Sequence, residues 1–160
     1  MRSQQETNRA IEKYADTVYR ICLLHLKNHA DSEDIFQNVF LKYVTYPREF
    51  ESEEHEKAWL IRVTVNACKD LKKSFFRSRV VPLEEIKDFE DAQQETYSEV
   101  LEAVLTLPEK YKNAIYLFYY EQYTAAEIGK ILGKNVNTVY TLLSRGKNIL
   151  KEKLGGDEFE

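Results

Sequence analysis

The chain has 160 residues, which suits one domain of ordinary size or two small ones, and it carries a formal net charge of −4. Its five glycines and three prolines are too few for an all-β protein built on turns, and its stretches rich in Glu, Lys, Leu, Ala and Gln favour helix. No apolar run approaches the roughly 18 residues that span a membrane, and the first residues lack the apolar core of a signal peptide, so we expect a cytoplasmic protein.

The first third of the chain predicts two amphipathic helices. Apolar residues recur every three or four positions, first in Ile11, Tyr14, Val18 and Ile21 and then in Ile35, Val39 and Tyr43. The first series predicts a helix from about Asn8 to Lys27. The second predicts a helix in HADSEDIFQNVFLKYV, which Asp31 or Ser32 can cap.

A third helix is predicted in EKAWLIRVTVNACKDLKKSFF, after a break that contains Pro47. The β-branched run from Ile61 to Val65 is also compatible with a strand, but the length of the segment and its four-residue spacing favour a helix. That spacing puts four apolar residues on one face, namely Trp59, Val63, Ala67 and Leu71. The segment also begins a basic block with a single acid, Asp70; its bases are Arg62, Lys69, Lys72, Lys73, Arg77 and Arg79.

An acidic segment separates this first helical unit from a second. PLEEIKDFEDAQQETYSEVLE contains Lys87 as its only base, and regular apolar spacing resumes at Val100, after which Pro108 opens a further helix. Eight bases meet four acids from Thr106 to Leu154, so the negative charge resides in the linker and the C-terminal tail. We predict an all-α fold of two small helical domains, 1–79 and 96–160, joined by a flexible acidic linker, 80–95.

The second domain ends in the pattern of a helix-turn-helix, TAAEIGKILGKNVNTVYTLLSRGKNIL. Thr124 and Glu127 have the spacing of a capping box, Gly129 is small where two helices cross, and Gly133 suits a left-handed turn residue. We expect Val139, Leu143, Leu150 and Leu154 to form the buried stripe of the second helix. Its opposite face offers side chains that can meet bases and phosphates, namely Asn137, Tyr140, Thr141, Ser144, Arg145 and Asn148. An ordinary helical hairpin is the alternative, but the pattern favours DNA binding.

The third helix carries a second candidate surface. Arg62, Asn66 and Lys69 share one helical face, and the amide of Asn66 can both donate to and accept from the edge of an unpaired base. Phe50 and Trp59 could stack against bases that an opened duplex exposes. For Trp59 the better interpretation is a core residue, because a lone Trp on an apolar stripe usually packs inside.

Enzymatic and metal chemistry find little support in the sequence. Cys22, His25 and His29 could meet on one helix face, but no fourth ligand lies nearby, and we predict no metal and no cofactor. The two cysteines, Cys22 and Cys68, are too far apart in helical patterns to suggest a disulfide framework. No phosphate loop or nucleophile motif is present, so we predict that the protein is not an enzyme.

The two halves together resemble the extracytoplasmic-function (ECF) group of bacterial RNA polymerase sigma factors over nearly the whole chain. The resemblance rests on three motifs of the family, matched by Glu33, Asp34, Gln37 and Phe40, by Trp59, Leu60, Arg62 and Asn66, and by Leu107 and Pro108. It implies a factor that gives RNA polymerase its promoter recognition and opens DNA for transcription initiation.

The resemblance also implies roles for individual residues. The polymerase-docking set would be Asp34, Gln37, Phe40, Leu41 and Lys42. The set that holds unpaired minus-ten DNA would be Phe50, Arg62, Val63, Asn66, Lys69 and Lys73. The set that reads the minus-thirty-five element would be Asn137, Thr138, Tyr140, Thr141, Ser144, Arg145, Lys147 and Asn148. The partners would be core RNA polymerase, promoter DNA and a dedicated anti-sigma factor, with no stable homo-oligomer.

The chain departs from the family at its recognition helix. Tyr140, Thr141 and Leu142 stand where basic residues are usual, and Lys134 stands where an apolar residue is usual. Contacts to the minus-thirty-five element are therefore expected to shift toward Arg145, Lys147 and Asn148. A free-standing helix-turn-helix regulator is the second hypothesis, although such a protein normally needs a dimer interface and the first domain offers no long heptad seam.

Overall fold

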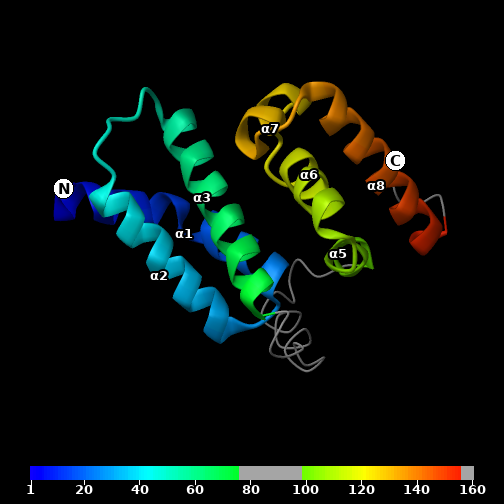
Figure 1. Ribbon diagram of the computed structural model, residues 1–160, viewed down its shortest axis with the longest axis horizontal. Coiled ribbons are helices and arrows are strands. Elements are labelled where there is room, and N and C mark those ends of the chain that lie inside the picture. Colours follow the sequence, from blue (N-terminus) through cyan, green and yellow to red (C-terminus); the bar gives the residue numbers. More distant parts are fainter. Residues whose placement is uncertain (76–98, 156–160) are drawn as a thin grey trace. The chain divides into compact units, whose positions relative to one another are not determined.

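The computed structural model describes residues 1–75 and 99–155, and every regular element in these two ranges is an α-helix. The chain divides into two units, Met1–Ala92 and Gln93–Glu160. Among the described residues, the first unit has three helices and the second has four. Figure 1 labels each of them. The all-α prediction is confirmed, whereas the predicted acidic linker, 80–95, lies outside the described residues. No helix within the described ranges is long and apolar enough to cross a membrane.

In unit 1, α1 (Gln4–Leu26) packs against α2 (His29–Thr45) and α3 (Glu53–Phe75), which also contact each other. Helix α1 starts four residues before the predicted Asn8, because the side chain of Ser3 caps it by accepting from the amide of Glu6 at 3.0 Å. Periodicity alone missed this turn because its residues, QQET, are all polar. The predicted stripes of the first two helices are confirmed in the core, except that Ile11 is only partly buried.

The predicted cap of α2 was wrong. Asn28 caps the helix by accepting from the amide of Asp31 at 2.8 Å. Ser32 lies inside the helix and is fully buried. The helix therefore begins about a turn earlier than Asp31 or Ser32 would allow. Only Lys27, at a φ of 60°, and Asn28 lie between α1 and α2.

The buried face of α3 is shifted from the predicted one. Leu60, Ile61, Val65 and Cys68 are buried, together with Thr64, whose hydroxyl donates to the carbonyl of Leu60 at 2.6 Å. The predicted face packs against the edge of the core and is only partly buried, namely Trp59, Val63, Ala67 and Leu71. The apolar residues of this helix span more than one stripe, so spacing alone could not choose which of them face inward.

Unit 2 contains α5 (Glu99–Leu105), α6 (Glu109–Tyr119), α7 (Ala125–Leu132) and α8 (Val136–Leu154). Helix α8 contacts each of the other three helices, so it is the central helix of the unit. Pro108 is the N-cap residue of α6, next to the predicted first turn. Of the apolar positions predicted in α6, Ala114 and Ile115 are buried but Phe118 is exposed.

Candidate functional site

The turn between α7 and α8 has the geometry of a helix-turn-helix. Thr124 and Glu127 form the predicted capping box, with the amide of Thr124 donating to Glu127 Oε1 at 2.8 Å and the amide of Glu127 donating to Thr124 Oγ1 at 3.2 Å. Gly133 ends α7 at a φ of 69°, as predicted. Asn135 then caps α8 by accepting from the amides of Asn137 and Thr138 at 2.8 and 3.2 Å.

Gly129 must lack a side chain mainly because the backbone of the turn approaches it, and less because α7 and α8 cross there. A Cβ added at this position would stand 2.6 Å from the carbonyl oxygen of Lys134, which is part of the turn, and 3.7 Å from Val139 Cγ2 on α8. The amide of Lys134 donates to the carbonyl of Gly129 at 2.8 Å, so the turn is held against α7 by its own backbone. The prediction that this position must be small is correct, but the closest neighbour is backbone.

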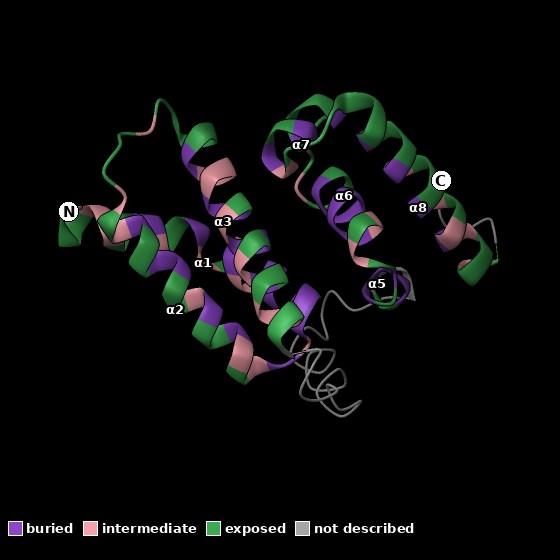
Figure 2. Cartoon of the chain, in the orientation of Figure 1, coloured by how far each residue is buried: buried purple, intermediate pink, exposed green. Residues whose placement is uncertain are grey.

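Helix α8 separates a buried side from an exposed side. Val139, Leu142 and Leu150 are buried, while Leu143 and Leu154 are only partly buried, so Leu142 takes the place predicted for Leu143. Seven residues of the predicted DNA-reading set are exposed, namely Asn137, Thr138, Tyr140, Thr141, Ser144, Arg145 and Asn148; Lys147 is half-buried. Figure 2 shows this exposed side along the helix. The arrangement leaves hydroxyl, amide and guanidinium groups accessible to a ligand.

Helix α2 presents a mixed polar and apolar face. Asp34, Gln37 and Lys42 are exposed, and Leu41 is 63% exposed between them. Phe40 differs from the other members of the predicted docking set, because it is only 5% exposed and belongs to the core. Its ring centroid lies 4.9 Å from that of Phe36 and 6.3 Å from that of Tyr43. Phe40 therefore supports this face from below and is not available for direct contact.

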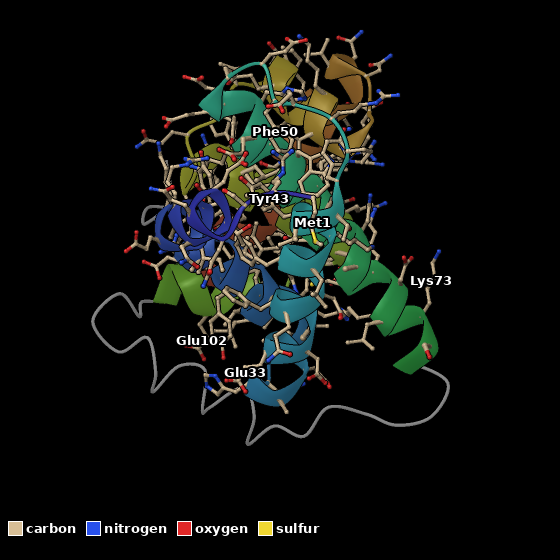
Figure 3. All side chains as sticks on the ribbon, turned by 90° about the vertical axis from the view of Figure 1, so that its left-hand side faces the viewer. Met1, Glu33, Tyr43, Phe50, Lys73 and Glu102 are labelled. Atoms are coloured by element: carbon tan, nitrogen blue, oxygen red, sulfur yellow. The ribbon has the colours of Figure 1, made fainter. Side chains whose placement is uncertain are left out.

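Helix α3 presents a second polar face. Arg62, Asn66, Lys69 and Lys73 are exposed at spacings of three and four residues, and Val63 beside them is half-buried. In Figure 3, the side chain of Lys73 projects outward from α3 near the C-terminal end of that helix. Three cations and one amide on a single face favour a polyanionic ligand, and the amide adds the ability to read a base edge.

Phe50 lies in the loop between α2 and α3, inside a cluster of aromatic rings. Its ring is nearly parallel to those of Tyr43 and Tyr46, with centroid separations of 6.0 and 5.4 Å, and lies 5.5 Å from the ring of Trp59. Figure 3 shows Tyr43 and Phe50 on the same side of the unit. Trp59 is half-buried and packs against the core from its edge, so the prediction of a core residue holds only in part. Phe50 is also half-buried, so part of its ring remains accessible.

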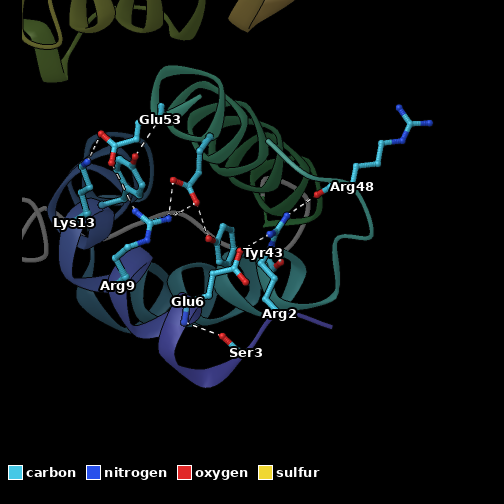
Figure 4. A network of polar contacts seen from close by, with 10 residues as sticks. Arg2, Ser3, Glu6, Arg9, Lys13, Tyr43, Arg48 and Glu53 are labelled. Atoms are coloured by element: carbon cyan, nitrogen blue, oxygen red, sulfur yellow. Dashed lines mark hydrogen bonds and ion pairs between the residues drawn. The ribbon is translucent and has the colours of Figure 1, made fainter. Parts of the chain in front are cut away.

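A polar network joins the three helices of unit 1 near this cluster (Figure 4). Glu56 is only 4% exposed and accepts from Arg9 Nη2 through both carboxylate oxygens, at 3.1 and 2.9 Å, and from the hydroxyl of Tyr43 at 2.6 Å. Burial, and then the hydrogen bond and charge of Glu56, raise the pKa of Tyr43 above its usual value. Burial, followed by the same carboxylate, raises the pKa of Tyr14 to about 12.

Two models of known protein families match the chain, one within each helical unit. Residues 10–79 match the family described as Sigma-70 region 2, and residues 97–150 match the family described as Sigma-70, region 4. The chain is 28% identical to the RNA polymerase sigma factor SigV of Bacillus subtilis, over 90% of this chain and 88% of that protein. It is also 28% identical to the ECF RNA polymerase sigma factor SigW of the same organism, over 90% and 86% of the two chains. The chain belongs to the ECF group of RNA polymerase sigma factors.

Two solved structures share the fold of this chain. The sigma factor RpoE of Bartonella quintana, in complex with the anti-sigma factor NepR, matches with a TM-score of 0.70 and 17% identity, over 96% of this chain and 99% of that chain. CnrH, in complex with the cytosolic domain of CnrY, matches with a TM-score of 0.72 and 19% identity, over 98% and 92%. At these identities the likeness establishes the fold alone.

Membership of this group decides between the two hypotheses drawn from the sequence. A free-standing helix-turn-helix regulator is not favoured, because region 2 and region 4 of the sigma-70 family both match within one chain. Sigma factors are DNA-binding transcription initiation factors, a different class of protein from enzymes.

Sequence reasoning missed several residues that shape this sigma factor. The buried carboxylate of Glu56 follows Glu53 and Glu54 in one acidic run, and no spacing distinguishes it from them. Arg2 lies before the first apolar stripe and gave no signal of its long-range contacts. Asn135 could have been found, because an Asn directly before an apolar-periodic segment is a recognised N-cap signal.

Proposed function

We propose that this sigma factor binds core RNA polymerase, directs it to a promoter and opens the DNA there without covalent chemistry. The observation that carries the proposal is the pair of exposed polar faces on α3 and α8, which lie within the matches to region 2 and region 4. Each face lies on a helix whose opposite side is packed in a core, so its side chains are presented on a firm support.

Polymerase docking is assigned to the exposed face of α2. Asp34, Gln37 and Lys42 supply polar contacts, and the exposed side chain of Leu41 supplies an apolar one. Phe40 contributes indirectly, by fixing the helix on the core. A central apolar anchor with polar groups around it is a common arrangement of protein interfaces.

Minus-ten opening is assigned to α3 and the loop before it. Arg62 and Asn66, with Val63 and Phe50, engage a base that leaves the stack, and Lys69 and Lys73 attract the phosphates that follow it. The amide of Asn66 can pair with the Watson–Crick edge of a base only when that edge is free of its partner base. This contact would therefore stabilise opened DNA and not the closed duplex.

Minus-thirty-five recognition is assigned to the exposed side of α8. Asn137, Thr138, Tyr140 and Thr141 lie in its first turns, next to the helix-turn-helix, and are expected to meet base edges. Ser144, Arg145, Lys147 and Asn148 follow and are expected to meet phosphates. The order matches the usual docking of a recognition helix, whose N-terminal part contacts the bases.

Regulation by a dedicated anti-sigma factor is part of the proposal. RpoE and CnrH, which share the fold, occur in complexes with such a factor and with the cytosolic domain of CnrY respectively. We further propose that this sigma factor acts in the cytoplasm with one copy per polymerase, through domains 1–79 and 96–160 on either side of linker 80–95.

The decisive test adds the purified protein to core polymerase and measures transcripts from a library of promoter fragments. We expect transcripts that depend on both components and on a shared promoter sequence. Binding of the isolated protein to DNA without any transcript would instead support a free-standing regulator.

The opening surface is tested with Asn66→Ala and Arg62→Ala. Both variants should bind polymerase normally but give weak reactivity of unpaired thymines toward permanganate, since they lose contacts made only with unpaired DNA. Asn8→Ala, an exposed asparagine on α1, is the matched control and should behave as wild type. Loss of polymerase binding in a folded Asn66→Ala variant would move the residue to the docking surface.

The recognition helix is tested for a division of roles. Arg145→Ala should weaken binding of the polymerase complex to all promoters and reduce its salt dependence, because a phosphate contact is lost. Thr141→Ala should change the preferred minus-thirty-five sequence. Lys153→Ala, on the same helix but outside the proposed set, is the control for loss of a cation. An unchanged consensus for Thr141→Ala in a selection from random sites would remove it from the reading set.

A further inference from the structure

The loop that carries Phe50 is held by the second residue of the chain. Arg2 lies before α1, but its side chain is only 6% exposed, because it reaches across to the end of α2 and the loop that follows. Its backbone amide donates to the carbonyl of Val44 at 2.9 Å, and its Nε donates to the carbonyl of Tyr43 at 3.0 Å. Both carbonyls belong to the last turn of α2, where backbone donors are scarce; the carbonyl of Tyr43 accepts only one further bond that the structure gives, from the amide of Tyr46 at 3.3 Å.

The same guanidinium also contacts the loop directly (Figure 4). Its Nη2 donates to the carbonyl of Arg48 at 2.6 Å, two residues before Phe50, while its Nη1 is fixed by Glu6 Oε2 at 2.8 Å. The guanidinium carbon stands 4.7 Å from the centroid of the Phe50 ring and 4.8 Å from that of Tyr43. Arg2 therefore contacts the loop at two points, the backbone carbonyl of Arg48 and the aromatic ring of Phe50.

On the side of α1, the support of the loop depends strongly on this residue. A depression of about 270 Å³ lies there, lined in part by Arg2, Phe50 and Glu49. Such an open space gives Phe50 few packing neighbours in that direction, so on this side the hydrogen bonds of Arg2 and its cation over the ring restrain the loop. The rings of Tyr46 and Trp59 restrain it elsewhere. Only a planar group with several fixed donors can reach a helix end, a loop carbonyl and a ring together, and a lysine cannot.

We propose that Arg2 is a positioning residue for promoter opening, which holds the Phe50 loop in the conformation that receives an unpaired base. The inference rests on the proposed role of Phe50 and adds a residue that does not touch DNA. A loop that is already ordered pays less conformational entropy when it captures a base, so capture competes better with re-closing of the duplex. Removing Arg2 should leave most of the docking face of α2 intact, because Asp34 and Gln37 lie on earlier turns of that helix. Lys42 lies in the last turn, but Arg2 contacts backbone carbonyls there and not the side chain of Lys42.

The first test follows the loop in the free protein. Trp59 is the only tryptophan of the chain and lies within 5.5 Å of the Phe50 ring, so its fluorescence reports the order of the cluster. Arg2→Ala and Arg2→Lys should both make Trp59 more accessible to acrylamide, whereas Lys13→Ala, which removes a cation from the same unit, should not. Unchanged quenching in Arg2→Ala would overturn the claim that Arg2 orders the loop.

The second test follows promoter opening by the complex with core polymerase. At a temperature where all variants are folded, Arg2→Ala should open a duplex promoter at least tenfold more slowly and bind polymerase within twofold of wild type. On a promoter with a pre-unpaired minus-ten element, the difference from wild type should shrink. Arg2→Lys should recover only part of the rate, and it serves in place of Arg2→Ala if that variant does not fold. Wild-type opening rates in both Arg2 variants would overturn the inference.

A double-substitution cycle separates positioning from general stability. If Arg2 acts through Phe50, adding Arg2→Ala to Phe50→Ala should cause little further loss, whereas independent effects would multiply. Multiplying losses would overturn the inference. If wild type fails to open any promoter with polymerase, the proposed function fails, and the quenching experiment still decides whether Arg2 holds the loop.

Discussion

Replacing Glu56 should reveal how much the buried polar network contributes to the stability of unit 1. The carboxylate accepts from Tyr43, whose side chain is fully buried, and from Arg9, whose side chain is 46% exposed. Glu56→Ala removes the acceptor for both groups at once. Loss of this acceptor destabilises the fold more at Tyr43 than at Arg9, because water can reach the guanidinium of Arg9 but not readily the hydroxyl of Tyr43.

The magnitude follows from that difference. Leaving a buried hydroxyl without a partner costs about 1–3 kcal/mol. The ion pair with a half-exposed arginine is screened and contributes about 0–1 kcal/mol. We therefore expect Glu56→Ala to lower the free energy of unfolding of unit 1 by about 2–3 kcal/mol, within the range of substitutions that break a buried network. Glu56→Gln keeps an acceptor for Tyr43 and should lose about half as much.

The assay is urea denaturation of the full chain, followed through the emission of Trp59. Because this is the only tryptophan and lies in unit 1, its signal reports that unit selectively. The control is Glu53→Ala, which removes an exposed carboxylate paired with Lys13 one turn earlier on the same helix, and we expect no resolvable change. Equal effects of Glu53→Ala and Glu56→Ala, or a change below about 0.5 kcal/mol for Glu56→Ala, would refute a stabilising role for the buried carboxylate.

Further predictions concern pH and the helix-turn-helix. Because the pKa of Tyr43 is raised, the folded state holds the proton of this hydroxyl at a pH where the unfolded state releases it. The protonated hydroxyl therefore contributes its full stabilisation of the folded state below about pH 10, and this contribution is lost as the pH rises further. Tyr43→Phe should make the decline of stability above that pH shallower in urea titrations. Asn135→Ala removes the cap of α8 and should cost about 1 kcal/mol, seen as faster amide exchange in the first turn of α8. Gly129→Ala should speed exchange in both α7 and α8, since its Cβ would meet the carbonyl of Lys134; unchanged exchange would mean that the turn relaxes freely.

The sequence was sufficient where a local rule decides the structure. The capping box at Thr124 and the left-handed glycine at Gly133 were both predicted, because each depends on residues within one turn. The stripe of α2 was also predicted, since its apolar residues occupy a single face.

The sequence was insufficient where the structure depends on contacts across the unit. Helix α3 has apolar residues on more than one face, so its buried side is chosen by α1 and α2 and not by its own spacing. Phe40 matched a family motif, but it is buried because it belongs to the core cluster that residues of α1 and α3 complete. The contacts of Arg2 with Tyr43 and Arg48 join residues more than 40 positions apart, and no local pattern encodes them.

The proposed docking and opening surfaces can be separated by mutation because each lies on its own helix. Helix α2 directs Ile35, Val39 and Tyr43 inward and leaves its docking face outward, while α3 does the same with Leu60 and its DNA face. The ring contacts between the end of α2 and α3 involve the buried Tyr43 and the half-buried Tyr46 and Trp59, and none of these is in the docking set or the minus-ten set. Tyr43 links the two helices most fully, because it contacts both the carboxylate of Glu56 on α3 and the ring of Phe50. A signal between polymerase binding and DNA opening would therefore have to pass through the core around that residue.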